Sequence, residues 1–218
     1  MPENLLPTLI YIIPNILFGL TIHECAHAWT ADRLGDPTAR LMGRVTLNPI
    51  PHLDPVGTIF LLINALHGFG FGWAKPVPVN VLNLHHPRRD NVLVSAAGPV
   101  SNLILAALFG LVFRVVDPLA GDQGILMSAA KLAEIGVSMN VGLAVFNLIP
   151  LYPLDGSHVL EGLLPSSAQS AYAAFSRFGP AVLIVLIFMG SFGGPPILTM
   201  ILLPPIRLLF ALFTGQSF

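Results

Sequence analysis

Three side chains near residue 25 have the types and spacing of a catalytic metal site. The stretch His23-Glu24-Cys25-Ala26-His27 places two histidines four residues apart. On a helix, both imidazoles would lie on one face and could bind the same ion. Glu24 would lie about 100° around the same turn, where it can reach a water on that ion without binding metal itself. This pattern predicts a zinc hydrolase, in which zinc acidifies the water and Glu24 takes its proton.

The composition indicates a membrane protein. Of the 218 residues, 54% are hydrophobic and only 10% are charged, and the mean hydropathy is +0.78. A soluble domain has about a quarter of its residues charged. The net charge of -1 and the lack of a basic tract argue against a nucleic-acid partner. The first residues lack the basic region of a signal peptide, so we expect the first span to be retained.

Apolar stretches predict an all-α polytopic membrane protein with about five to six transmembrane helices, in a single domain of residues 1–218. The expected core spans are residues 5–31, 92–113, 126–149, 171–189 and 197–213. Residues 35–90 are rich in proline and in turn signals, and they would form an insertion between the first two full spans.

Two parts of this insertion have a predicted structure. Val56 to Leu66 is too short to cross a bilayer, so we expect it to be re-entrant or interfacial. Residues 74–83 would form an extended strand in which Pro76 and Pro78 remove donors from one edge only. The other edge could bind a substrate segment, and its residues are Val77, Val79 and Val81.

A third metal ligand is needed, and spacing alone leaves its identity open. Asp155 and His158 follow the proline-broken end of the span 126–149, and both have a suitable side chain. The other candidates by residue type are His52, Asp54, His67, His85, His86 and Glu161. Asn147 lies just before the break, where it could stabilise a substrate carbonyl or its oxyanion. Alternatively, its amide bonds the carbonyls that Pro150 frees.

Two further asparagines, Asn102 and Asn140, lie inside predicted spans. A polar side chain inside a bilayer needs a partner, so we expect both to form hydrogen bonds between helices. No catalytic role is predicted for either of them.

Three motifs together resemble the site-2 protease family of intramembrane zinc metalloproteases. They are His23-Glu24-Cys25-Ala26-His27, Ala97-Gly98-Pro99 and the stretch from Asn147 to Gly156, which contains Leu154-Asp155-Gly156. Residues 43–49 and 75–80 resemble the short bacterial and archaeal members, and no PDZ or CBS domain is recognised. The resemblance implies cleavage of peptide bonds within or beside the bilayer. It also implies one zinc ion per chain with Asp155 as the third ligand.

We therefore expect a multi-pass endopeptidase of the cell membrane, of the type that acts in regulated intramembrane proteolysis. Its partners would be a membrane-protein substrate and the lipid bilayer. The alternative is a membrane transporter or metal-binding scaffold that uses the same ligands without proteolysis. Transporters usually have broken helices in both halves, and only one half here has a proline-broken, acid-bearing segment. A pure binding site also has no need of Glu24, so the enzyme is favoured.

The metal site restricts the topology, because ligands of one ion must lie at one depth in the bilayer. His23 and His27 are near the C-terminal end of the first span, and Asp155 follows the C-terminal end of the span 126–149. These two spans must then run in the same direction. The positive-inside rule places the active site nearer the cytoplasmic face. The basic residues that this topology puts on one side are Arg33, Arg40, Arg44, Lys75, Arg88 and Arg89.

Overall fold

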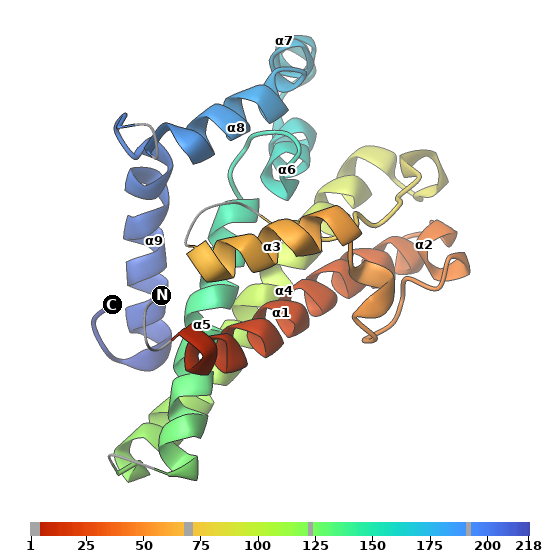
Figure 1. Cartoon of the computed structure of the whole chain (residues 1–218). Helices are drawn as coiled ribbons and strands as arrows, with labels where there is room; N and C mark the ends of the chain where they lie inside the picture. Colours follow the sequence, from red (N-terminus) through yellow and green to blue (C-terminus); the bar gives the residue numbers. More distant parts are fainter. Residues whose placement is uncertain (1–4, 68–71, 122–123, 191–192) are drawn as a thin grey trace.

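The computed structural model describes residues 5–67, 72–121, 124–190 and 193–218, and its regular elements are helices (Figure 1). The α-helices are α1 (Leu5–Arg33), α2 (Thr38–Leu41), α3 (Pro55–His67), α4 (Pro87–Val116), α5 (Ile125–Asn147), α6 (Asp155–Leu163), α7 (Ser166–Ser176), α8 (Gly179–Met189) and α9 (Ile197–Thr214). The short 3-10 helices among the described residues are η1 (Ile50–His52), η2 (Val81–Asn83) and η3 (Asp117–Leu119). The all-α class predicted from the sequence is confirmed.

Among the described residues, four helices are long and apolar enough to cross a membrane, namely α1, α4 with η3, α5 and α9. One face of α4 exposes Ile104, Leu108, Leu111 and Val115, which recur at helical spacing. A continuous apolar face of this kind is stable against lipid and not against water. The chain is therefore a multi-pass membrane protein.

The predicted span 171–189 is not one continuous helix in the structure. It consists of α7 and α8, whose axes differ by 58°. Pro180 at the start of α8 explains the break, because a proline inside a continuous helix would remove a backbone hydrogen bond. Gly179 also packs against the chain before α6, and a Cβ there would lie 2.3 Å from the Tyr152 carbonyl oxygen. As one bent span, the pair would bring the number of crossings to five.

The insertion between α1 and α4 contains the two segments predicted from the sequence. The short apolar segment from Val56 to Leu66 is part of the helix α3, and residues 74–83 are irregular apart from η2. The 13 residues of α3 extend about 20 Å, too little for the ~30 Å hydrocarbon core. The strand expected at residues 74–83 is not confirmed. Among the described residues, only an isolated bridge between Leu53 and Ala74 forms there. A strand needs a partner, and here the Arg44 side chain binds the carbonyls of Lys75 and Pro76 instead.

Buried Asp36 attaches the end of this irregular segment to the end of α1. Its Oδ2 accepts a hydrogen bond from the Asn80 N–H at 2.7 Å, and its Oδ1 accepts one from the Asn83 side chain at 2.9 Å. Burial alone would raise the pKa of the Asp36 carboxyl, but these bonds and those from Thr38 outweigh it. The pKa of Asp36 is therefore lowered. The charged form of Asp36 thus helps to fix residues 75–80.

The long helices pack through small and branched side chains. Ala106 of α4 and Val137 and Val141 of α5 are fully buried, with Phe210 of α9 beside them. At the far end of α4, Arg114 donates hydrogen bonds to the last carbonyls of α9. In Figure 1, α4 runs in the opposite sense to α5, so the C-terminal end of α5 lies near the start of α4. The C-terminal end of α1 also lies there, since His27 contacts the Val94 carbonyl and Ala31 packs in one apolar cluster with Val94.

Candidate metal centre and active site

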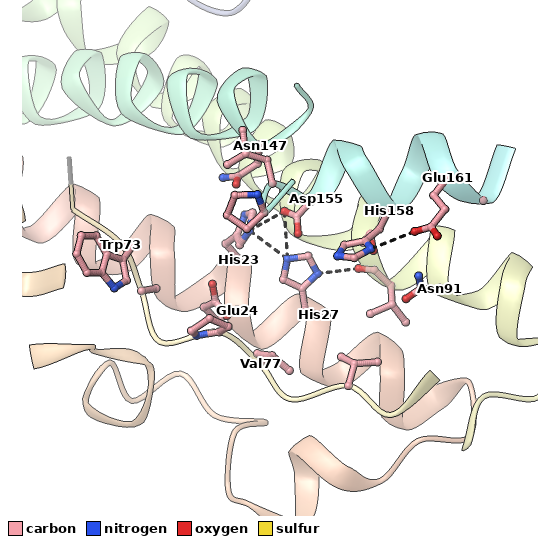
Figure 2. A pocket seen from close by; sticks show the side chains of 18 of the residues that line it. His23, Glu24, His27, Trp73, Val77, Asn91, Asn147, Asp155, His158 and Glu161 are labelled. Atoms are coloured by element: carbon pink, nitrogen blue, oxygen red, sulfur yellow. Dashed lines mark hydrogen bonds and ion pairs between the residues drawn. The ribbon is translucent and has the colours of Figure 1, made fainter. Parts of the chain in front are cut away.

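His23 and His27 of α1 meet Asp155 at the first position of α6 (Figure 2). The two histidine Nε2 atoms are 3.1 Å apart, and they lie 3.1 and 3.4 Å from Asp155 Oδ2. Zinc bonds of 2.0–2.1 Å in a tetrahedron would separate the ligand atoms by about 3.3 Å. Within the described parts of the chain, no other group of three His, Cys, Asp or Glu side chains could hold a metal ion.

The environment of Asp155 fits a metal ligand. Its Oδ2 atom is buried and makes no hydrogen bond within the described structure. An unsatisfied buried acceptor costs about 1–3 kcal/mol, so such an atom requires a reason. A cation shared with the two imidazoles would satisfy it. Two histidine nitrogens and one carboxylate oxygen with an open fourth position form a donor set suited to catalytic zinc.

The other nitrogen of each histidine has a fixed partner. His27 Nδ1 lies 2.7 Å from the Val94 carbonyl oxygen, and His23 Nδ1 lies 2.6 Å from Asn102 Oδ1. Both partners are on α4, and both are acceptors in this arrangement. An acceptor at Nδ1 keeps the proton there and leaves the Nε2 lone pair free for a metal.

Gly98 allows α4 to pass directly beside the histidine pair. A Cβ at this position would lie 2.4 Å from His27 Nε2 and 2.7 Å from His23 Nε2. Any side chain would therefore displace both imidazoles. This contact gives a physical reason for glycine in the Ala97-Gly98-Pro99 motif.

A second glycine and an arginine position Asp155. A Cβ on Gly156 would lie 2.3 Å from the Leu148 carbonyl oxygen, so glycine allows α6 to start against the end of α5. Arg88 of α4 donates hydrogen bonds to the Gly162 and Leu164 carbonyl oxygens at the other end of α6. With both ends held, the carboxylate of Asp155 has a defined position relative to α1.

Glu24 lies beside the three proposed ligands, which are called the triad below. It also lies near the buried cation Arg44, which the sequence did not connect with the site. Arg44 Nη2 is 3.9 Å from Glu24 Oε2, and the Arg44 side chain is only 4% exposed. Burial lowers the pKa of Arg44, and the nearby Glu24 opposes this effect. Because Arg44 also binds the carbonyls of Lys75 and Pro76, it connects Glu24 to the irregular segment. The sequence suggested only that Arg44 was one of several basic loop residues.

His23, Glu24, His27 and Asp155 line one cavity of about 860 Å³ (Figure 2). The proposed substrate-contact residues line the same cavity; they are Val77, Val79, Val81 and Asn147. Val81, however, begins η2 and does not continue an extended edge. Asn147 donates its amide to the Leu143 carbonyl of its own helix at 3.0 Å, not to a carbonyl freed by Pro150.

The alternative third ligands lie apart from the triad or have other partners. His52 Nε2 bonds the Thr46 carbonyl, and Asp54 accepts the Gly57 N–H. His158 lines the cavity, but its nearest charged partner is Glu161 at 3.8 Å. His85 and His86 do not join the group around His23. The side chain of His67 lies outside the described residues.

Comparisons with known proteins identify relatives over most of the chain. Residues 115–189 match the profile of Peptidase family M50. A Bacillus subtilis protein named "Putative zinc metalloprotease YwhC" is 41% identical over 196 residues, which cover 88% of this chain and 85% of that protein. Proteins named "Putative zinc metalloprotease Rip2" from Mycolicibacterium smegmatis and Mycobacterium tuberculosis are 35% and 32% identical, over 85% of this chain and 70% and 69% of their own lengths. No solved structure matches the chain.

The close approach at Gly98 leads to a first prediction. Gly98→Ala should weaken zinc binding at least about tenfold, because the added methyl group displaces both imidazoles. Zinc affinity can be measured by competition with a chromogenic chelator on purified protein in detergent. Gly142→Ala is the matched control, since a Cβ there meets nothing within 4 Å. Equal zinc affinity in the two variants would contradict the proposed role of Gly98.

Proposed function

Since the chain belongs to peptidase family M50 and is a zinc metalloprotease, we propose that it cleaves peptide bonds of polypeptides that span or lie against the membrane. The observation that carries this proposal is the convergence of His23, His27 and Asp155 beside Glu24, in a cavity with largely apolar walls. Membership of a peptidase family favours the enzyme over the transporter or scaffold. The lipid bilayer is the environment in which this chemistry takes place.

In this proposal, His23, His27 and Asp155 hold one zinc ion, and Glu24 is the general base. A zinc ion held there supplies Lewis acidity, which lowers the pKa of a water molecule and polarises a peptide carbonyl. Glu24 accepts the proton of the attacking water and later delivers it to the leaving amide nitrogen. Asn147 lines the cavity and has a second amide N–H beyond the one that bonds Leu143, so it can donate to the developing oxyanion.

The segment with Val77 and Val79 is proposed to bind the substrate. A helical substrate hides its carbonyls in its own hydrogen bonds, so it must be unwound before cleavage. The N–H groups of Val77 and Val79 make no hydrogen bond to the described part of the chain, and both residues line the cavity. An unwound segment can pair with these groups, as in strand addition to an open edge.

The orientation in the membrane is also proposed. The ends of α1 and α5 that lead to the metal site are on the side that carries Arg33, Arg40 and Arg88. The positive-inside rule makes this side cytoplasmic, with the N-terminus outside and the active site nearer the cytoplasm.

The role of Glu24 is tested by separating proton transfer from metal binding. Glu24→Gln should lower the rate of cleavage of a single-span substrate by at least about 10²-fold, because the general base is lost. It should keep about one zinc per chain, whereas His23→Ala should lose both activity and zinc. Metal content and cleavage are measured on the same purified sample. Retained activity, or zinc loss like that of His23→Ala, would disprove the assignment.

Strand addition is tested at Val79. Val79→Pro removes one N–H from the proposed edge and should suppress cleavage of a membrane-spanning substrate while zinc stays bound. Val79→Ala is the control, because it loses similar packing against the apolar cluster of Ala31, Leu84 and Val94 but keeps the N–H. The initial rates of both variants are compared with the unchanged chain. If Val79→Pro cleaves as fast as Val79→Ala, the segment does not bind substrate in this way.

The orientation is tested with single cysteines in a Cys25→Ala background. A membrane-impermeant thiol reagent on intact cells should label a cysteine at Gln123, which lies outside the described residues, and should not label one at exposed Arg40. Both positions should react after the cells are opened. Labelling of Arg40→Cys from outside, with Gln123→Cys protected, would reverse the proposed topology.

A further inference from the structure

A buried chain of carboxamides begins at His23 and crosses three helices. His23 Nδ1 of α1 lies 2.6 Å from Asn102 Oδ1 of α4. The Asn102 Nδ2 donates to the Gly19 carbonyl oxygen at 3.1 Å and to Asn140 Oδ1 of α5 at 2.9 Å. Asn140 Nδ2 then donates to the Gly136 carbonyl oxygen at 2.9 Å.

The direction of every hydrogen bond in this chain is fixed by backbone carbonyls. A carbonyl oxygen can only accept, so Gly19 and Gly136 must face the NH₂ groups of Asn102 and Asn140. The Oδ1 of each asparagine therefore points the other way, and Asn102 Oδ1 faces His23. Because Asn102 Oδ1 can only accept, His23 Nδ1 must be the donor of this hydrogen bond. Nδ1 therefore carries a proton, and Nε2 is the nitrogen that faces Asp155 and His27 and can bind a metal.

Burial makes this arrangement stable. Asn102 and Asn140 are both 0% exposed, so solvent does not compete for their amide groups. Gly19 allows α5 to approach closely, since a Cβ there would lie 2.8 Å from Asn140 Oδ1. A reversed Asn102 amide would place its NH₂ group against His23 and its oxygen against two acceptors. The packing thus permits one orientation of the amide.

We propose that Asn102 is a positioning residue for the metal site, whose carboxamide holds His23 with its proton on Nδ1 and aims Nε2 at the zinc. This role rests on the proposed function, because it assumes that His23 is a ligand. A hydrogen bond that only joins helices would not have this effect. Here, the packing of α1, α4 and α5 determines which nitrogen of His23 faces the metal position. Partners of this kind typically contribute 10–100-fold to metal affinity.

The test compares two buried asparagines. Asn102→Leu has nearly the same volume but offers no acceptor, and it should raise the zinc dissociation constant about 10–100-fold. Asn15 is the matched control because it is 2% exposed and bonds α1 to α5 through the Leu132 carbonyl, without contacting His23. Asn15→Leu should leave the zinc dissociation constant unchanged. With cobalt(II) as a spectroscopic substitute, the d–d bands should shift in Asn102→Leu only.

The outcomes distinguish a failure of the proposed function from a failure of the role assigned to Asn102. If the unchanged chain binds no zinc, the proposed function fails and Asn102 has no ligand to position. If the unchanged chain binds zinc and both variants bind it equally, only the role of Asn102 is disproved.

A measurement on the unchanged chain covers the case in which Asn102→Leu does not fold. In nitrogen-15 NMR of zinc-loaded protein labelled at histidine, the two zinc-bound histidines should bind the metal through Nε2 and carry a proton on Nδ1. A zinc-bound histidine with its proton on Nε2 would overturn the inference.

Discussion

Three side-chain atoms that could bind one metal ion, from His23, His27 and Asp155, lie within 3.4 Å of one another inside the helix bundle, and the packing around them depends on this close approach. Ionisable groups at membrane depth are costly unless they have partners, so each one needs a nearby element to satisfy it. Gly98 lets α4 approach the imidazoles, and Gly156 lets α6 begin against α5. Both glycines therefore serve the same purpose, which is to bring backbone close enough for the ligands to meet.

The irregular segment at residues 75–80 has a polar attachment at each end. Arg44 binds its first carbonyls and lies 3.9 Å from Glu24, and Asp36 accepts the Asn80 N–H. The middle of the segment, with Val77 and Val79, lines the cavity. Such an arrangement holds a backbone in place without pairing it to a second strand. In the proposed mode of binding, a substrate segment supplies the missing partner.

Local spacing was sufficient to predict part of this structure. The four-residue separation of His23 and His27 specifies a common helix face wherever the helix lies, and long apolar runs specify spans. Asp155 could be chosen over His158 only through the family resemblance, because the choice depends on how α6 packs. A polar residue inside a span predicts that Asn102 bonds across helices, but the partners of Asn102 and Arg44 lie far away in the sequence, and no local pattern identifies them. The strand predicted at 74–83 is not confirmed for a related reason, since a strand forms only where a second segment pairs with it.

X-ray absorption at the zinc edge of the purified chain is the most direct measurement of the central claim. The account predicts a first shell of nitrogen and oxygen at about 2.0–2.1 Å, with an imidazole contribution from two histidines and no sulfur. The spectrum of Asp155→Ala should lose one oxygen neighbour or lose zinc altogether. A sulfur neighbour at about 2.3 Å, which could come only from Cys25 or a methionine, or an unaltered spectrum in Asp155→Ala, would contradict the proposed site.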